Sequence, residues 1–148
     1  MGKPRYRPAQ MGASADDVEA AFYEALQAGD IHQLMACWAD EDDIVCVHPG
    51  GSRVVGAAAI RSAFEAMLAN GSLRILPERK RKVESLSASV HNVLERIDMI
   101  TAEGPQHAWV VATNVFLKTA QGWRLVAHHA SPASTEVAEV TVSSQLLH

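Results

Sequence analysis

The period of the apolar residues changes near Asn70, and this change constrains the fold more than any other feature of the chain. Before Asn70, apolar residues recur at three- and four-residue spacing, which is typical of one buried face of a helix. From residue 73 to Pro132 they recur largely at alternate positions, which is typical of strands. Helices first and antiparallel strands afterwards predict an α+β fold, in which the helices cover one face of a curved sheet.

Three helices are expected in the first half of the chain. The first begins after Ser14, which suits an N-cap before acidic residues, and ends at Gly29, which suits a C-cap. Asp30 caps a second, shorter helix whose apolar stripe ends at Trp38, so we expect Trp38 to be a core residue. The third helix follows Gly56.

A short apolar strand over residues 44–47 precedes the corner His48-Pro49-Gly50-Gly51, after which residues 52–55 return as its partner. The basic run at residues 78–82 is predicted to be a solvated edge or turn rather than a phosphate-binding site. The remaining predicted strand segments are 73–76, 82–89, 90–102, 107–118 and 123–131.

Length and charge exclude several classes of protein. A chain of 148 residues corresponds to about one domain, and a net charge of -4 gives no sign of a nucleic-acid partner. No segment has the ~20 apolar residues of a membrane span and none reads as a secretory signal, so we expect no membrane contact and a cytoplasmic location. We expect residues 1–13 to be a flexible arm, residues 14–132 to be the domain, and residues 133–148 to be a tail that adds an edge strand or contacts a dimer partner.

Several stretches, taken in order, resemble a known family. They are Phe22–Asp30, Trp38–Asp43, Val47–Gly50, Val55–Arg61 and Gly122–Ser131. Together they are similar to the SnoaL-like branch of the nuclear transport factor 2-like superfamily, which includes ketosteroid isomerase. The resemblance implies a cone-shaped, cystatin-like roll, in which a curved antiparallel sheet and three N-terminal helices enclose a pocket and the outer sheet face forms a homodimer. It does not imply one activity, because this superfamily holds isomerases, cyclases, dehydratases and non-catalytic binding or association domains.

The positions that carry catalysis in ketosteroid isomerase have changed in this chain. The carboxylate base of that enzyme corresponds to His48, its tyrosine to Phe22, and its protonated aspartate to Asn114. The neighbouring Tyr23 points about 100° away from Phe22 around the helix, so it would need a register shift to replace the missing tyrosine. Ketosteroid isomerase activity itself is therefore not expected.

His48, Asn114 and His129 are the candidate catalytic residues. The imidazole of His48 suits a general base or acid, whereas a structural histidine would instead hydrogen-bond the acidic turn. Asn114 lies mid-strand among apolar residues, so it needs a partner: a ligand carbonyl, a neighbouring strand or a buried water. His128 and His129 face opposite sides of their strand; we expect His129 inside, although a slip of one residue would exchange the two.

The expected pocket is mostly apolar, so its ligand would be a small hydrophobic molecule such as a carbonyl compound. We expect no redox or metal cofactor, because a site built from His48, His129 and Asp42 lacks the spacing of helical metal-ligand pairs. The expected ligand-binding wall consists of Phe22, Trp38, Phe64, Ala112, Phe116 and Ser131.

The sequence is compatible with two functions. One is a cofactor-free isomerase, dehydratase or cyclase, in which His48 moves a proton next to a carbonyl and Asn114, with His129, stabilises the oxyanion. The other is a non-catalytic module that binds a small ligand, or a partner protein through its sheet face. An open cavity at His48 would favour the enzyme, and a pocket filled by side chains would favour the module.

Overall fold

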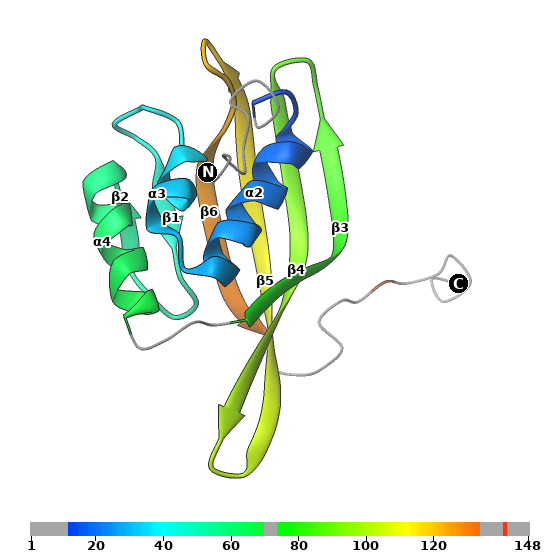
Figure 1. The fold of residues 1–148 in the computed structure, drawn as a ribbon. Helices are drawn as coiled ribbons and strands as arrows, with labels where there is room; N and C mark the ends of the chain where they lie inside the picture. The colour runs from blue at the N-terminus through cyan, green and yellow to red at the C-terminus, as the bar shows by residue number, and fades with distance from the viewer. Residues whose placement is uncertain (1–11, 70–73, 134–140, 142–148) are drawn as a thin grey trace, which may run out of the picture.

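The computed structural model describes residues 12–69, 74–133 and 141, and within them it has the predicted α+β fold (Figure 1). The helices of this part lie on one face of a six-stranded sheet. They are α2 (Ala15–Ala28), α3 (Ile31–Ala36) and α4 (Ala57–Leu68).

The two predicted caps hold the first helices in place. The side chain of Ser14 accepts a hydrogen bond from the backbone N–H of Asp17, 3.0 Å away, and Asp30 does the same for Gln33 at the start of α3. Gly29 ends α2 with a φ of 69°, a left-handed conformation that glycine adopts without strain. A single glycine therefore separates the last turn of α2 from the cap of α3.

The sheet has the strand order β2-β1-β6-β5-β4-β3. All neighbouring strands are antiparallel except β1 and β6, so the sheet is mixed where a fully antiparallel one was expected. The strands are β1 (Val45–Val47), β2 (Arg53–Val55), β3 (Arg74–Glu84), β4 (Ala88–Thr101), β5 (Gly104–Thr119) and β6 (Gly122–Ala133).

Alternate residues of the long strands face the helices and form one core with them. Val93 on β4, Phe116 on β5 and Leu125 on β6 join Phe22 and Phe64 of the helices in this core. The residues between them face the side of the sheet that no described helix covers.

Two strand boundaries differ from the prediction. The basic run lies inside β3, which continues through Pro77 because a bulge between Glu78 and Arg81 takes up the irregularity. The break between β3 and β4 instead falls at residues 85–87, where the Ser85 side chain accepts hydrogen bonds from the backbone N–H groups of Ser87 and Ala88.

No helix in the described part of the chain is long and apolar enough to cross a membrane. Residues 1–11, and residues 134–148 apart from 141, lie outside the described residues, so the arm and the tail stay predictions.

Candidate functional site

A polar network lies inside the core, with Asn114 at its centre. The Nδ2 atom of Asn114 donates to Oε2 of Glu19, 2.9 Å away, and to the hydroxyl of Tyr23, 3.1 Å away. The Oδ1 atom of Asn114 accepts from Nδ1 of His128 at 2.5 Å. Asn114 is fully buried and is partnered on both sides of its amide, as a buried polar group requires. Of the predicted partners, the neighbouring strand is confirmed, because His128 lies on β6; the two partners on α2, Glu19 and Tyr23, were not predicted.

Tyr23 extends the network to Glu95. Its hydroxyl donates to Oε2 of Glu95 over 2.6 Å, and both residues are buried. Burial raises the pKa of Glu95 to about 7, against the opposing effect of the Tyr23 hydrogen bond. Burial and the nearby charge of Glu95 raise the pKa of Tyr23 well above its ordinary value. Glu95 is therefore a carboxyl group that exchanges its proton near neutral pH.

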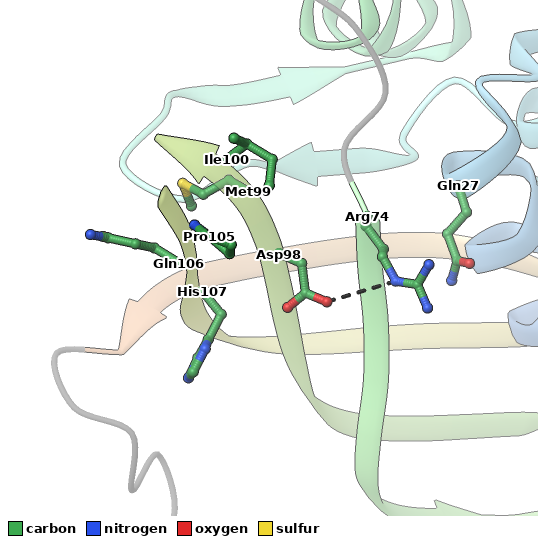
Figure 2. A pocket seen from close by; sticks show the side chains of 8 residues that line it. All are labelled: Gln27, Arg74, Asp98, Met99, Ile100, Pro105, Gln106 and His107. Carbon is green, nitrogen blue, oxygen red and sulfur yellow. Dashed lines mark ion pairs between the residues drawn. The ribbon is translucent and has the colours of Figure 1, made fainter. Parts of the chain in front are cut away.

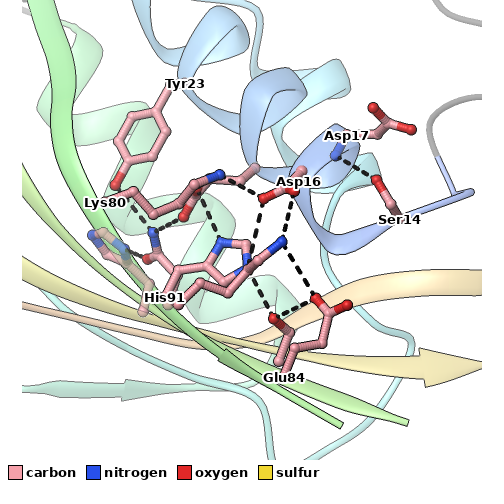
Figure 3. A network of polar contacts seen from close by, with 12 residues as sticks. Ser14, Asp16, Asp17, Tyr23, Lys80, Glu84 and His91 are labelled. Atoms are coloured by element: carbon pink, nitrogen blue, oxygen red, sulfur yellow. Dashed lines mark hydrogen bonds and ion pairs between the residues drawn. The ribbon is translucent and has the colours of Figure 1, made fainter. Parts of the chain in front are cut away.

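Glu19 lies on the same helix face as Tyr23, one turn earlier. Burial alone would raise the pKa of its carboxyl, but contacts with His91 and Asn114 outweigh that effect and lower it. Nδ1 of His91 lies 3.0 Å from Oε1 of Glu19, and Figure 3 shows how His91, Lys80 and Asp16 gather there between α2 and the strands. Two carboxyl groups of one network thus have opposite preferences, Glu19 for the charged form and Glu95 for the neutral form.

His128 is the histidine that enters the network. Burial lowers its pKa to about 3, so the ring is neutral, and its Nδ1 carries the hydrogen that Asn114 accepts. Its ring also packs against Phe22, with ring centroids 5.4 Å apart.

His48 lies at the edge of the core and is half-buried. Its ring meets the Phe64 ring edge-on, with centroids 4.7 Å apart, and its Nε2 lies 3.6 Å from Sγ of Cys46. Burial lowers the pKa of His48 and raises the pKa of Cys46 to about 12, so the pair is an imidazole beside a neutral thiol rather than a reactive thiolate pair.

His129 and Ser131 do not face the core, contrary to prediction. Both are exposed, whereas His128 and Ala130 are buried. The reason is a bulge: Val115 pairs with Ala127 but Phe116 pairs with Leu125, so Val126 is an extra residue in β6. The extra residue reverses the alternation, and His128 takes the inward position that a regular strand would give to His129.

The aromatic residues expected to wall a cavity are packed against one another. The Phe22 ring contacts those of Trp38 and Phe64 edge-on, with centroids 6.4 Å and 6.0 Å apart. Phe116 and Ala112 belong to the same core, and Phe116 packs against His91. The space in front of Asn114 is therefore occupied largely by side chains.

The described residues form several open pockets, among them a large one at the β4–β5 hairpin and a smaller one between α2 and β3. The larger, of about 790 Å³, is formed by the free end of the β4–β5 hairpin, the start of β3 and Gln27; it contains the ion pair of Arg74 with Asp98 (Figure 2). The smaller, of about 240 Å³, lies between α2 and β3 and is lined by Glu19, Tyr23 and Lys80 among others. Only the smaller one reaches the buried network.

Sequence reasoning missed Glu19, His91 and Glu95, predicted that Tyr23 points away from the Phe22 position, and expected His128 inside only if the strand slipped by one residue. A signal for part of the network was present. Glu19 and Tyr23 are four residues apart on the apolar face of α2, and His91 and Glu95 share the inward phase of β4 with Val93. Polar residues at inward positions on two elements predict partners for one another.

The chain was compared with known families and structures. The family model of the SnoaL-like domain matches residues 16–135, and no curated protein matches the chain. A structure from Thiobacillus denitrificans ATCC 25259, provisionally described as a calcium/calmodulin-dependent protein kinase type II association domain, is 32% identical; the match covers 82% of this chain and 97% of that one, with a TM-score of 0.74. A Streptomyces avermitilis protein, provisionally described as a dehydratase of the NTF2-like family, is 27% identical over 80% of this chain and 93% of its own, with a TM-score of 0.71. A Nostoc punctiforme protein with a cystatin-like fold is 16% identical over 84% of this chain and 97% of its own, with a TM-score of 0.67, and shows the fold alone.

Proposed function

The chain belongs to the SnoaL-like domain family of the NTF2-like superfamily, and from that premise we propose that it is an association module that pairs two copies through the helix-free face of its sheet. The observation that carries this proposal is the apolar character of that face. An antiparallel sheet with one face in water normally shows polar residues there.

The outward positions form cross-strand rows. Val90, Val115 and Ala127 make one apolar row, and Leu94 and Val111 make most of another, beside Ser131. The row between them is polar and consists of Asn92, Thr113 and His129. Leu94 is only 6% exposed although it lies outside the helix-side core, so its neighbours on the outer face already cover it. An apolar patch on one face of a sheet is typical of an interface.

Trp109 continues this surface next to Arg96 and Ala133. The indole Nε1 of Trp109 is buried and has no hydrogen-bond partner in the described structure. Tryptophan and arginine are enriched at the centres of protein interfaces, where a partner satisfies such a group. A second copy placed face to face would present the same residues in return, as in a twofold dimer.

Two further observations support an association role. The 32% identical relative is itself described as an association domain. The side chains around Asn114 fill much of the space in which a substrate was expected, which favours the non-catalytic reading of the two that the sequence left open.

Light scattering coupled to size exclusion tests the proposal. We expect the wild type to have twice the mass of one chain, and Val90→Lys and Val115→Lys to have the mass of one chain, because a charge buried in an interface without a partner is costly. Leu86→Lys is the matched control: Leu86 is 93% exposed in the β3–β4 turn, away from this face. Circular dichroism checks that each variant folds.

A monomeric wild type at micromolar concentration would refute the proposal. Dimers of both Val90→Lys and Val115→Lys with unchanged stability would do the same, since the interface would then lie elsewhere.

A second candidate is a cofactor-free dehydratase or isomerase that acts next to a carbonyl, and the pair Tyr23–Glu95 favours it. Glu95 can exchange a proton near neutral pH, and Tyr23 lines the α2–β3 pocket and can carry that proton to a small carbonyl compound. The 27% identical relative described as a dehydratase agrees with this chemistry. His48, the proton carrier expected from the sequence, lies at the opposite edge of the core from this pocket.

A panel of small β-hydroxy carbonyl compounds tests the second candidate. Turnover that is lost in both Tyr23→Phe and Glu95→Gln, and kept in Asn92→Ala on the outer face, would support it. Turnover that survives both changes would exclude this pair as the proton carrier.

A further inference from the structure

Two carboxylates and an imidazole come together where the first turns of α2 lie against β4. Asp16, Glu19 and His91 each offer one ligand atom, and these atoms lie within 4.8 Å of one another. Figure 3 shows Asp16 and His91 of this group. Asp16 and Glu19 are three residues apart on one helix face, and His91 comes from the inward side of β4. Neither proposed function uses this group of atoms as a site.

The orientation of His91 leaves its Nδ1 atom without a hydrogen bond. The Nε2 atom lies 2.9 Å from Oγ of Ser89, and that hydroxyl donates to Oε1 of Glu84, also at 2.9 Å. Because the single hydroxyl hydrogen of Ser89 goes to Glu84, Nε2 must be the donor to Ser89. A neutral His91 therefore has a bare Nδ1, fully buried and without a hydrogen-bond partner, facing Glu19.

The spacing of the two facing atoms suits a shared metal ion better than direct contact. Nδ1 of His91 and Oε1 of Glu19 are 3.0 Å apart, but not in hydrogen-bond geometry. With a bare Nδ1 these are two acceptors that repel each other, and a cation between them, either a proton or a metal ion, removes the repulsion. A metal ion with bonds of about 2.1 Å to each atom, at a right angle, would hold them about 3 Å apart.

The other contacts of these residues match those of metal ligands. Ser89 and Glu84 fix the ring of His91 through its second nitrogen, and Asn114 fixes Glu19 through Oε2, leaving Oε1 directed at His91. Such outer contacts orient ligands and are a regular part of metal centres.

Lysine ammonium groups occupy the cation position in this structure. Nζ of Lys80 lies 2.5 Å from Oδ1 of Asp16 and 3.4 Å from Oε1 of Glu19, and Lys82 contacts the other oxygen of Asp16 at 2.9 Å. The ammonium contacts hold the pKa of Asp16 at about 2. Both lysines are exposed, so their side chains can turn out into solvent without unfolding the strand.

We propose that Asp16, Glu19 and His91 form a site for a divalent first-row transition-metal ion, and that Lys80 is the internal cation the metal displaces. One nitrogen and two carboxylate ligands suit zinc, cobalt or manganese. This site shares no residue with the set His48, His129 and Asp42, for which no metal is expected from the sequence.

Cobalt and zinc titrations of the full chain, first stripped with a chelator, test the site. We expect one Co²⁺ per chain with visible absorption bands, and competition by Zn²⁺ in calorimetry. His91→Ala and Glu19→Gln should each weaken binding by about 100-fold or more, and Ser89→Ala by about 10-fold. Lys80→Met should strengthen binding by about 10-fold, because the competing cation is gone.

His107→Ala is the matched control, since His107 is an exposed histidine on β5 far along the strand from this site. It should leave metal affinity unchanged. Absence of one-to-one binding in both the wild type and Lys80→Met would overturn the proposal. Binding that His91→Ala and Glu19→Gln leave unchanged, while thermal unfolding shows that both variants fold, would overturn it as well.

Discussion

The hydroxyl of Tyr23 on α2 donates a 2.6 Å hydrogen bond to the carboxyl of Glu95 on β4, across 72 residues of sequence. This bond joins the first helix to the middle of the sheet inside the core. It also joins two groups whose pKa values are raised by burial.

Tyr23→Phe removes the hydroxyl and leaves Glu95 without that donor. We expect the free energy of unfolding to fall by about 1–3 kcal/mol, the cost of an unsatisfied buried polar group. Glu95→Gln keeps an oxygen that accepts from Tyr23 and should cost less. Urea unfolding followed by circular dichroism measures both, and a larger loss for Glu95→Gln would contradict the assignment of Tyr23 as the donor.

Glu95 and His128 should give the protein opposite pH dependences. Glu95 has a folded pKa of about 7 and an ordinary value of 4.5, so its contribution to stability is full below pH 4.5 and is lost as the pH rises to 7. His128 has a folded pKa of about 3 and an ordinary value of 6.5, so its contribution is present above pH 6.5 and is lost as the pH falls to 3. Each of these pKa shifts corresponds to a change on the order of 3–5 kcal/mol in the free energy of unfolding.

Between pH 6.5 and 4.5 the two effects cancel, and we expect nearly constant stability there, followed by a steep loss below pH 4.5. Glu95→Gln should remove the compensation, so that stability declines from pH 6.5 downward. His128→Asn should do the reverse and become more stable as the pH falls from 7 to 4.5. Melting temperatures measured across this pH range test the prediction. Identical pH profiles for the wild type, Glu95→Gln and His128→Asn would refute the compensation between the two groups.

Gly122 and Gly104 allow a direct test of a close backbone contact. Both have a φ near +104°, so alanine is strained by a similar amount at either position. A Cβ atom at Gly122 would lie 2.7 Å from the carbonyl oxygen of Gly12, whereas at Gly104 it would meet nothing within 4 Å. Gly122→Ala should therefore destabilise the fold by about 1–3 kcal/mol more than Gly104→Ala. Equal melting temperatures would show that Gly12 does not lie against the hairpin.

The pKa of His48 should lie below 6.5 in an NMR titration, because burial lowers it, while His128 should show no titration above pH 4. Phe64→Ala opens the space beside the His48 ring and should move its pKa toward the ordinary value. A His48 pKa above 6.5 in the wild type would place a carboxylate next to the ring and contradict its apolar setting.

The parts of the fold that depend on neighbouring residues could be predicted from the sequence. Ser14, Gly29 and Asp30 act through bonds to residues within a few positions, and all three cap helices as expected. The change of period at Asn70 separated helices from strands because burial on one face acts along each element by itself.

The parts of the fold that depend on strand register could not be predicted from the sequence. A single extra residue, Val126, reverses the inward and outward positions in β6, and nothing in the local pattern marks it. The bonds of Asn114 to Glu19 and Tyr23 span more than 90 residues, so they require knowing which helix face lies over which strand. Sequence reasoning therefore identified Asn114 as a buried polar residue in need of a partner, but not the partners.

The strand β3 has a consequence for how copies of this protein can assemble. It is one free edge of the described sheet, and it carries Pro77, a bulge at Glu78 and a row of basic residues. Proline offers no N–H, a bulge bends the edge away, and like charges repel an incoming strand. Growth of the sheet through the β3 edge is thereby blocked, which leaves the helix-free face for the proposed contact between two copies.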